Sequence, residues 1–166
     1  MSVSSIGHRS GSVRLHDYNF DEPGRYSPRA SYGQAKIANI WFANEIERRY
    51  GSRNLHATSL HPGGIVTGLQ KYIDLGTVKS WDTAAARAYM KSPAQGAATS
   101  VYAAVSKEQA SRGSKYLSNC EEQGEFEKQG KPQGRDDGYK LWAYGEEREG
   151  RLWKDSLKMV GLDGGE

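Results

Sequence analysis

Residues 29–51, RASYGQAKIANIWFANEIERRYG, contain the clearest secondary-structure signal in the chain. Apolar residues recur there at intervals of three and four, the spacing of one face of an α-helix. The residues that follow this spacing are Ile37, Ala38, Ile40, Trp41, Phe42 and Ile46. The pattern predicts a helix over residues 30–50, with Ser31 as its N-cap and Gly51 as its stop.

The same stretch places Tyr32 four residues before Lys36, so the two side chains lie one helical turn apart on the same face. With 10 Tyr and 11 Lys in 166 residues, about 0.7 pairs of this spacing are expected by chance. Alone, the pair is typical of an ordinary solvated helix face. Its meaning depends on the surrounding sequence.

Three strands are predicted, separated from one another by helices. Residues 55–61 alternate apolar and polar positions before they meet Pro62, residues 114–120 form another short run, and a stub around Val3 predicts a first strand. Strands that alternate with helices predict an α/β fold with a parallel sheet of about three strands. Such a sheet leaves one edge uncovered.

Two more helices are expected after the second strand. The segment 92–109 has Ser92 as its cap and Pro93 in its first turn, and it should bury one apolar side. The side consists of Ala97, Val101 and Val105. The tail 149–161 places Leu152, Trp153, Leu157 and Val160 on one helical face. Residues 119–138 are polar and rich in Gly, which predicts a long loop.

Composition narrows the function classes. The net charge of +3 comes from dispersed basic and acidic residues, which argues against a nucleic-acid partner, and no segment is apolar enough for a membrane span. A single cysteine, Cys120, favours a reducing compartment, so we expect a cytoplasmic protein. The four histidines and this cysteine lack the usual zinc-ligand spacings, so no metal site is expected.

Three motifs occur in a fixed order along the chain: VSS at 3–5, YGQAK at 32–36 followed by IAN, and HPGGIVT at 61–67. In this order the chain resembles the C-terminal half of a short-chain dehydrogenase/reductase, most closely the retinol-dehydrogenase-like and WW-domain-oxidoreductase-like members. The insert between Ser5 and Tyr32 and the segments SKYLSNCEEQ and GRLWKDSLKMVG are also similar to that subgroup. The resemblance implies a single domain, 1–166, with part of a Rossmann-like doubly wound sheet.

The resemblance also implies an activity, the interconversion of an alcohol and a carbonyl with NAD or NADP. A Tyr can exchange the proton if its phenol, with a pKa of about 10, is made more acidic by a nearby cation. The implied catalytic residues are Ser5, Tyr32 and Lys36. The implied cofactor-binding residues are Tyr32, Lys36, Pro62, Gly63, Ile65 and Thr67. A hydroxyl at Ser5 would hydrogen-bond the substrate oxygen.

The family's glycine turn and its Asn-Asn-Ala-Gly segment are not found in this sequence, so the nucleotide-binding N-terminal half is absent. GHRSGS at 7–12 does not replace the turn, because Val13 stands at the third glycine position. We therefore expect weak cofactor binding and no activity from this chain alone. The alternative is a truncated, non-catalytic module that forms a homo-oligomer or pairs with a related subunit through its open sheet edge.

Each site residue also has a structural interpretation. Ser5 can be a strand-end hydroxyl that completes a turn, and the Pro62 and Gly63 pair can simply end a strand. The order of the three motifs favours the catalytic interpretation.

Overall fold

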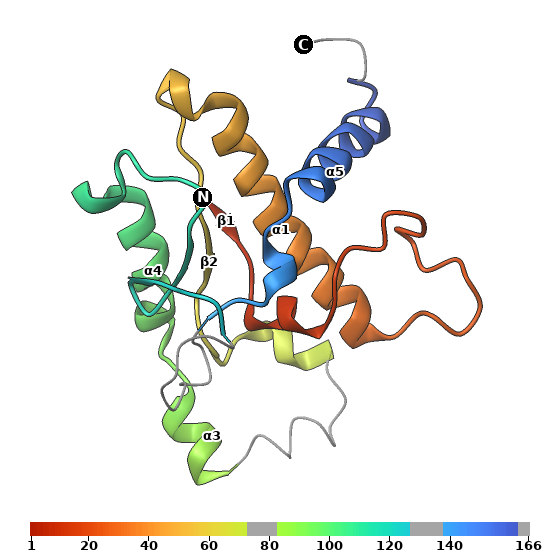
Figure 1. Ribbon diagram of the computed structural model, residues 1–166. Helices are drawn as coiled ribbons and strands as arrows, with labels where there is room; N and C mark the ends of the chain where they lie inside the picture. The colour runs from red at the N-terminus through yellow and green to blue at the C-terminus, as the bar shows by residue number, and fades with distance from the viewer. Residues whose placement is uncertain (73–82, 127–137, 163–166) are drawn as a thin grey trace.

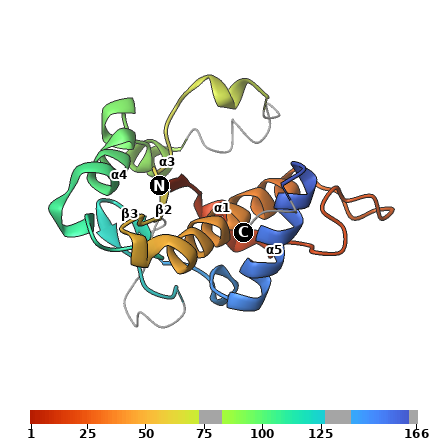
Figure 2. The same cartoon turned by 90° about the horizontal axis from the view of Figure 1, so that it is seen from above.

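The computed structural model describes residues 1–72, 83–126 and 138–162. The protein has the expected α/β architecture, a small and mostly parallel sheet with helices on both faces (Figure 1). The view from above shows α1 and α5 on one side of the strands and α4 on the other (Figure 2).

The sheet has the strand order β1-β2-β3-β4. Its three parallel strands are β1 (Ser2–Val3), β2 (Ser59–His61) and β3 (Tyr116–Ser118), and β4 (Glu121–Glu122) runs antiparallel to β3. Val3 is paired with Leu60, and Leu60 with Leu117. The two leucines are fully buried at the centre of the sheet.

Two strand predictions were wrong in detail. The second strand begins at Ser59, because Leu55 is 54% exposed and precedes the sheet. The predicted loop 119–138 begins instead with a hairpin to β4: Asn119 and Cys120 have φ of 53° and 60°, as a two-residue turn between antiparallel strands requires. Residues 127–137 of that predicted loop lie outside the described residues.

Helix α1 (Pro28–Tyr50) is the long helix that the sequence predicted, but its N-terminal end differs. The N-cap is Ser27, whose Oγ accepts the Ala30 amide at 3.1 Å, so the predicted Ser31 cap was wrong. A Ser followed by Pro at the first helical position provides both the acceptor and a residue whose φ already suits a helix. The C-terminal end is confirmed, because α1 ends at Tyr50 with Gly51 as its C-cap, and the 3-10 helix η2 (Gly51–Arg53) follows directly.

The inner face of α1 makes the main hydrophobic core. Ile37, Ile40 and Trp41 are fully buried on this face. They pack against buried residues from the loop, the sheet and the C-terminal segment, namely Val13, Tyr116, Ala143 and Leu152. This core holds α1 against the sheet beside β1 and β2, as the sequence period predicts.

Helix α4 (Pro93–Val105) begins as predicted but buries a different side. Ser92 forms a capping box with Gln95, with bonds of 3.2 and 2.8 Å between each side chain and the other's amide. The predicted apolar side is on the surface, with Val101 55% and Val105 73% exposed. Gly96 and Thr99 are buried instead: Gly96 lies against the Ile65 side chain, and the Thr99 Oγ1 accepts the Cys120 amide at 3.2 Å.

Helix α5 (Glu146–Met159) follows a 3-10 turn, η5 (Leu141–Ala143), and crosses α1. Leu152 is buried and Trp153 stacks on Phe42 of α1 at 5.0 Å, but Val160 is exposed beyond the helix end, so its predicted place on the packed face was wrong. The remaining described elements are η1 (Ile6–Ser10), η3 (Gly68–Tyr72), α3 (Ala84–Tyr89) and η4 (Lys107–Gln109).

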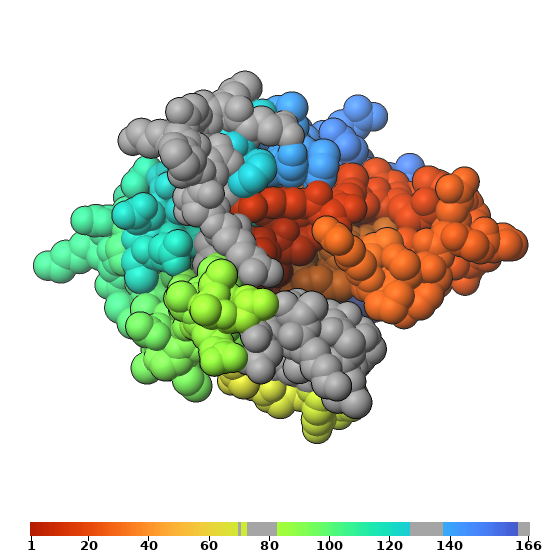
Figure 3. Space-filling view, turned by 90° about the horizontal axis from the view of Figure 1, so that it is seen from below, coloured from red at the N-terminus to blue at the C-terminus, as the bar shows by residue number. Residues whose placement is uncertain are grey.

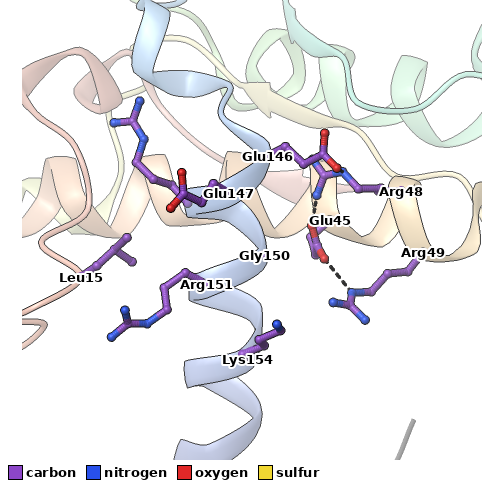
Figure 4. Close-up of a pocket in the computed structure, with 10 residues that line it drawn as sticks. Leu15, Glu45, Arg48, Arg49, Glu146, Glu147, Gly150, Arg151 and Lys154 are labelled. Atoms are coloured by element: carbon purple, nitrogen blue, oxygen red, sulfur yellow. Dashed lines mark hydrogen bonds and ion pairs between the residues drawn. The ribbon is translucent and has the colours of Figure 1, made fainter.

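A buried ionic network joins α1 to α5. Glu149 of α5 is 2% exposed, and its Oε1 accepts the Asn44 Nδ2 at 2.8 Å and the Gly145 amide at 3.0 Å. Arg48 lies between the carboxylates of Glu149 and Glu45, and Figure 4 shows it reaching Glu45 together with Arg49. Each buried carboxylate therefore depends on a guanidinium from α1.

Within residues 1–72, 83–126 and 138–162, none of the helices combines the length and the apolar character that crossing a membrane requires.

Arg48→Met should lower the free energy of unfolding by about 2–4 kcal/mol, because it leaves two buried carboxylates without their shared guanidinium. Urea unfolding followed by circular dichroism measures this loss. Arg151→Met is the matched control, since Arg151 is largely exposed and its ion pair within the described part of the chain is with Asp155 on its own helix, so the change should cost less than about 1 kcal/mol. Equal losses in the two variants would contradict the role of the buried network.

Candidate active site

Ser5 lies just after β1, where the chain turns into η1. It is the N-cap of that turn, and its Oγ accepts the Gly7 amide at 3.1 Å. Because the hydroxyl oxygen is the acceptor in this bond, its hydrogen remains available to donate to another oxygen. The preceding residue anchors the turn to α1, since the Ser4 Oγ donates to the Lys36 carbonyl at 2.7 Å.

The Tyr32 ring lies directly over this turn. A Cβ on Gly7 would stand 2.6 Å from the Tyr32 Cε1, and a Cβ on Gly33 would stand 3.0 Å from the Gly7 carbonyl oxygen. Only hydrogen atoms fit in these two places, so the first turns of α1 can approach η1 closely. Tyr32 itself is 44% exposed, so a ligand can reach its phenol.

Lys36 places an ammonium beside Tyr32. Its Nζ is 5.5 Å from the centre of the Tyr32 ring and donates to the Val3 carbonyl oxygen at 3.3 Å. Asn39 donates to the same oxygen at 3.0 Å, so the end of β1 is tied to two successive turns of α1.

The loop after β2 contains Pro62, Gly63, Ile65 and Thr67 and is held from the side by Lys91. The Lys91 amide donates to the Gly64 carbonyl at 2.8 Å, and the Lys91 side chain crosses Gly63, whose φ of 97° suits glycine. The Ile65 side chain occupies the place where Gly96 of α4 would have a Cβ. Thr67 is exposed, and its Oγ1 accepts the Leu69 amide at 3.3 Å.

The predicted site residues lie at one end of the sheet, where β1 and β2 end. Val3 is opposite Leu60 in the parallel pair, so the segments that follow β1 and β2 leave the sheet side by side. Figure 3 looks at the molecule from below, with the N-terminal segment at its centre, between the chain that leads into α1 and the α3 region. The structure thus brings Ser5, Tyr32 and Lys36 together and places the loop beside them.

His8 lies beneath this edge and is 0% exposed. Its Nδ1 is 2.6 Å from the Ser5 carbonyl oxygen, and its ring meets the Tyr116 ring edge-on at 4.9 Å. Burial lowers the pKa of His8 to about 4, although the bond to Ser5 acts in the opposite direction, and charge on Arg9 and His61 lowers it further. The imidazole is therefore neutral near pH 7.

A cavity of about 530 Å³ lies away from these residues, between α1 and α5 (Figure 4). It is lined by charged side chains such as Arg49, Arg151 and Lys154, and none of Ser5, Tyr32 and Lys36 contributes to it. In the described part of the chain, no group of three or more His, Cys, Asp or Glu side chains is arranged to hold a metal ion.

No protein-family model matches the chain. It is 46% identical over 165 residues to the short-chain dehydrogenase/reductase prx1 of Penicillium roqueforti, which covers 98% of this chain and 46% of that protein. The human protein named retinol dehydrogenase 14 is 32% identical and covers 96% of this chain and 43% of its own length. The chain belongs to the short-chain dehydrogenase/reductase family.

The chain spans about half the length of the curated short-chain dehydrogenase/reductase relatives it matches, and it corresponds to their C-terminal half. A solved structure agrees with the family's fold. The crystal structure of an uncharacterized protein from Mycobacterium Paratuberculosis superposes with a TM-score of 0.60 at 26% identity, over 96% of this chain and 48% of that one.

Sequence reasoning missed three residues that shape this site of the short-chain dehydrogenase/reductase. The sequence offers Gly7 only as part of a glycine turn, whereas in the structure it makes room for the Tyr32 ring. The sequence offers His8 only as a metal ligand and gives no sign of Lys91, whereas His8 bonds the Ser5 carbonyl and Lys91 bonds the loop after β2. The position of His8 three residues after Ser5 is the one signal that could have pointed to a turn contact.

The depressed pKa of His8 predicts acid sensitivity. Above pH 6.5 the ring is neutral in both the folded and unfolded chain. Between pH 6.5 and about pH 4, the unfolded chain binds a proton at His8 that the folded chain does not bind. The free energy of unfolding therefore falls by up to about 1.4 kcal/mol for each unit by which the pH drops in this window. Urea unfolding of the wild type and of His8→Asn across pH 4 to 7 measures the difference. An equal slope in both proteins would exclude His8 as the cause.

Proposed function

We propose that this chain is the catalytic half of an NAD(P)-dependent oxidoreductase that interconverts an alcohol and a carbonyl. The observation that carries the proposal is the contact between Gly7 and the Tyr32 ring, which joins the Ser5 turn to the helix that carries Lys36. A hydroxyl donor, a phenol and an ammonium at one sheet edge are the groups that a carbonyl needs when it is reduced.

The proposed roles follow from the donors and acceptors at the site. In reduction, the Ser5 hydroxyl donates to the substrate oxygen and the Tyr32 phenol transfers its proton to that oxygen. In alcohol oxidation, the Tyr32 phenolate accepts the proton of the alcohol. Lys36 holds a positive charge 5.5 Å from the centre of the Tyr32 ring and would stabilise the phenolate that forms in the reaction.

The residues present suit the nicotinamide end of NAD or NADP, which supplies or accepts the hydride when bound. Tyr32 and Thr67 are exposed and Lys36 is partly exposed, so a ribose or carboxamide can reach them. Pro62, Gly63 and the Ile65 backbone would border that end of the cofactor. The loop is already fixed by Lys91, so little ordering is needed on binding.

A second candidate, an interaction module, is supported by the open edge of the sheet. β1 has a neighbour on one side within the described sheet, and Val3 is 44% exposed there. Val101 and Val105 add an exposed apolar strip on α4. An edge strand and an uncovered helix side are surfaces that a second copy or a related subunit could cover.

Tyr32→Phe tests the catalytic proposal in a protein where this chain is joined to the nucleotide-binding half of a relative. The change keeps the ring over Gly7 but removes the proton donor, so turnover should fall by about 10²–10⁴-fold. Steady-state kinetics with NAD and NADP measure it. Tyr26→Phe, an exposed tyrosine outside the site, is the matched control and should keep full activity. Equal activity in the two variants would refute the role of Tyr32.

This 166-residue chain by itself should bind NAD and NADP with dissociation constants above about 1 mM. Only the nicotinamide end finds contacts, worth about 0.5–3 kcal/mol each, and these must offset an association cost of at least about 4 kcal/mol. Isothermal titration with each cofactor measures the affinity. A micromolar dissociation constant would show that the glycine turn is not needed.

The interaction-module candidate predicts association in solution. Size-exclusion chromatography with light scattering should then give a multiple of the 18.4 kDa chain mass. Val3→Lys places a charge on the exposed edge and should restore the monomer, whereas Ser52→Lys on the exposed η2 turn should not. A monomeric wild type would argue against this candidate.

A further inference from the structure

His8 makes an unusual double contact with the residue that carries the Ser5 hydroxyl. The Ser5 carbonyl oxygen accepts the backbone amide of His8 at 3.1 Å and the ring Nδ1 at 2.6 Å. The ring is held from behind by the edge of Tyr116, and the His8 carbonyl accepts the Trp142 Nε1 at 3.0 Å. The imidazole therefore has little freedom to turn away from Ser5.

Packing alone does not explain a histidine at this position. If Nδ1 donates to Ser5, the other ring nitrogen, Nε2, carries a lone pair. That atom is buried and has no hydrogen-bond partner among the residues that the structure describes. A buried acceptor without a donor costs stability, so an apolar side chain of similar size would fill the space at lower cost. The bond through Nδ1 is what the imidazole provides here that an apolar side chain cannot.

That bond acts on the two groups that the proposed reaction uses. Holding the Ser5 carbonyl fixes the turn in which the Gly7 amide donates to the Ser5 Oγ. Gly7 is also the residue on which the Tyr32 ring rests. A rotation of the Ser5 peptide would move the Ser5 hydroxyl and the Gly7 surface together. The His8 contact thus sets the position of the hydroxyl relative to the phenol.

We propose that His8 is a positioning residue, which fixes the Ser5 hydroxyl toward a substrate oxygen through its Nδ1 bond to the Ser5 carbonyl. The inference rests on the proposed function for the meaning of that hydroxyl. Whether His8 fixes the Ser5 hydroxyl can be measured without enzymatic activity. His8 touches neither substrate nor cofactor in this role, and it acts through Ser5.

Two variants separate positioning from packing. His8→Asn keeps a donor in the place of Nδ1, because the Asn Nδ2 is also bonded to Cγ. His8→Leu keeps an apolar side chain of similar bulk and removes the donor. We would measure thermal unfolding and, by NMR of the labelled 166-residue chain, the couplings about χ1 of Ser5 and the exchange rate of the Gly7 amide.

In His8→Leu the melting temperature should be unchanged or higher, the Ser5 side chain should populate several rotamers, and the Gly7 amide should exchange about tenfold faster. His8→Asn should keep the single rotamer and the slow exchange. A single Ser5 rotamer in His8→Leu would overturn the proposal. So would a His8→Leu variant that melts earlier, exchanges faster throughout the chain and is not rescued by Asn, since that pattern describes packing.

The catalytic consequence is measured in the same joined protein that tests Tyr32. His8→Leu should lower kcat about tenfold with KM unchanged, and His8→Asn should recover most of it. A loss confined to KM would overturn the positioning role. An inactive wild-type joined protein would count against the proposed function, whereas the NMR comparison would still decide whether His8 fixes Ser5.

Discussion

The close approach of α1 to the turn after β1 is the constraint on which the rest of the site depends. Gly7 and Gly33 face each other where a Cβ on either would collide with Tyr32 or with the Gly7 carbonyl. Because the first turns of α1 pack closely against η1, Lys36 in the third turn of the helix lies beside the end of β1 and can reach the Val3 carbonyl. The absence of a Cβ at Gly7 and Gly33 thus sets the position of α1 relative to η1.

The burial of the helix above those glycines fixes its rotation. Ile37, Ile40 and Trp41 face the core, and this leaves Tyr32 and Lys36 on a side of the helix that water can reach. At the far end, Glu149 and Arg48 fasten α5 to the same helix. Apolar packing therefore selects the face, and the ionic network fixes the helix end that is remote from the site.

The sequence predicted the elements that bury apolar side chains. It failed where polar or small residues determine the strand pairing or the buried side of a helix. The period of Ile37, Ile40 and Trp41 predicted α1, and the three parallel strands are confirmed. β4 consists of two exposed glutamates after a left-handed turn, so no hydrophobic pattern could reveal it. In α4 the valines suggested the buried side, but Gly96 and Thr99 form it, because the glycine leaves room for the Ile65 side chain.

The candidate site shows a similar division. The motif order predicted Ser5, Tyr32 and Lys36 as a group, and the structure places them at one edge of the sheet. Spacing could not predict the contact of Gly7 with Tyr32, because it arises only when the turn and the helix meet. The bond from His8 to the Ser5 carbonyl lies within the turn, and the interval of three residues is its only signal in the sequence. The catalytic roles themselves remain predictions.

The Val3 carbonyl has a consequence for aggregation. Ser2 and Ser4 use their amides to bond β2, so the Val3 amide and carbonyl point away from that strand. The carbonyl accepts from Lys36 and Asn39. An incoming strand must displace an ammonium and an amide to gain one bond, which weakens the template that a bare edge would offer to amyloid-like stacking. Lys36 and Asn39 of α1 thus occupy the Val3 carbonyl on the unpaired side of β1.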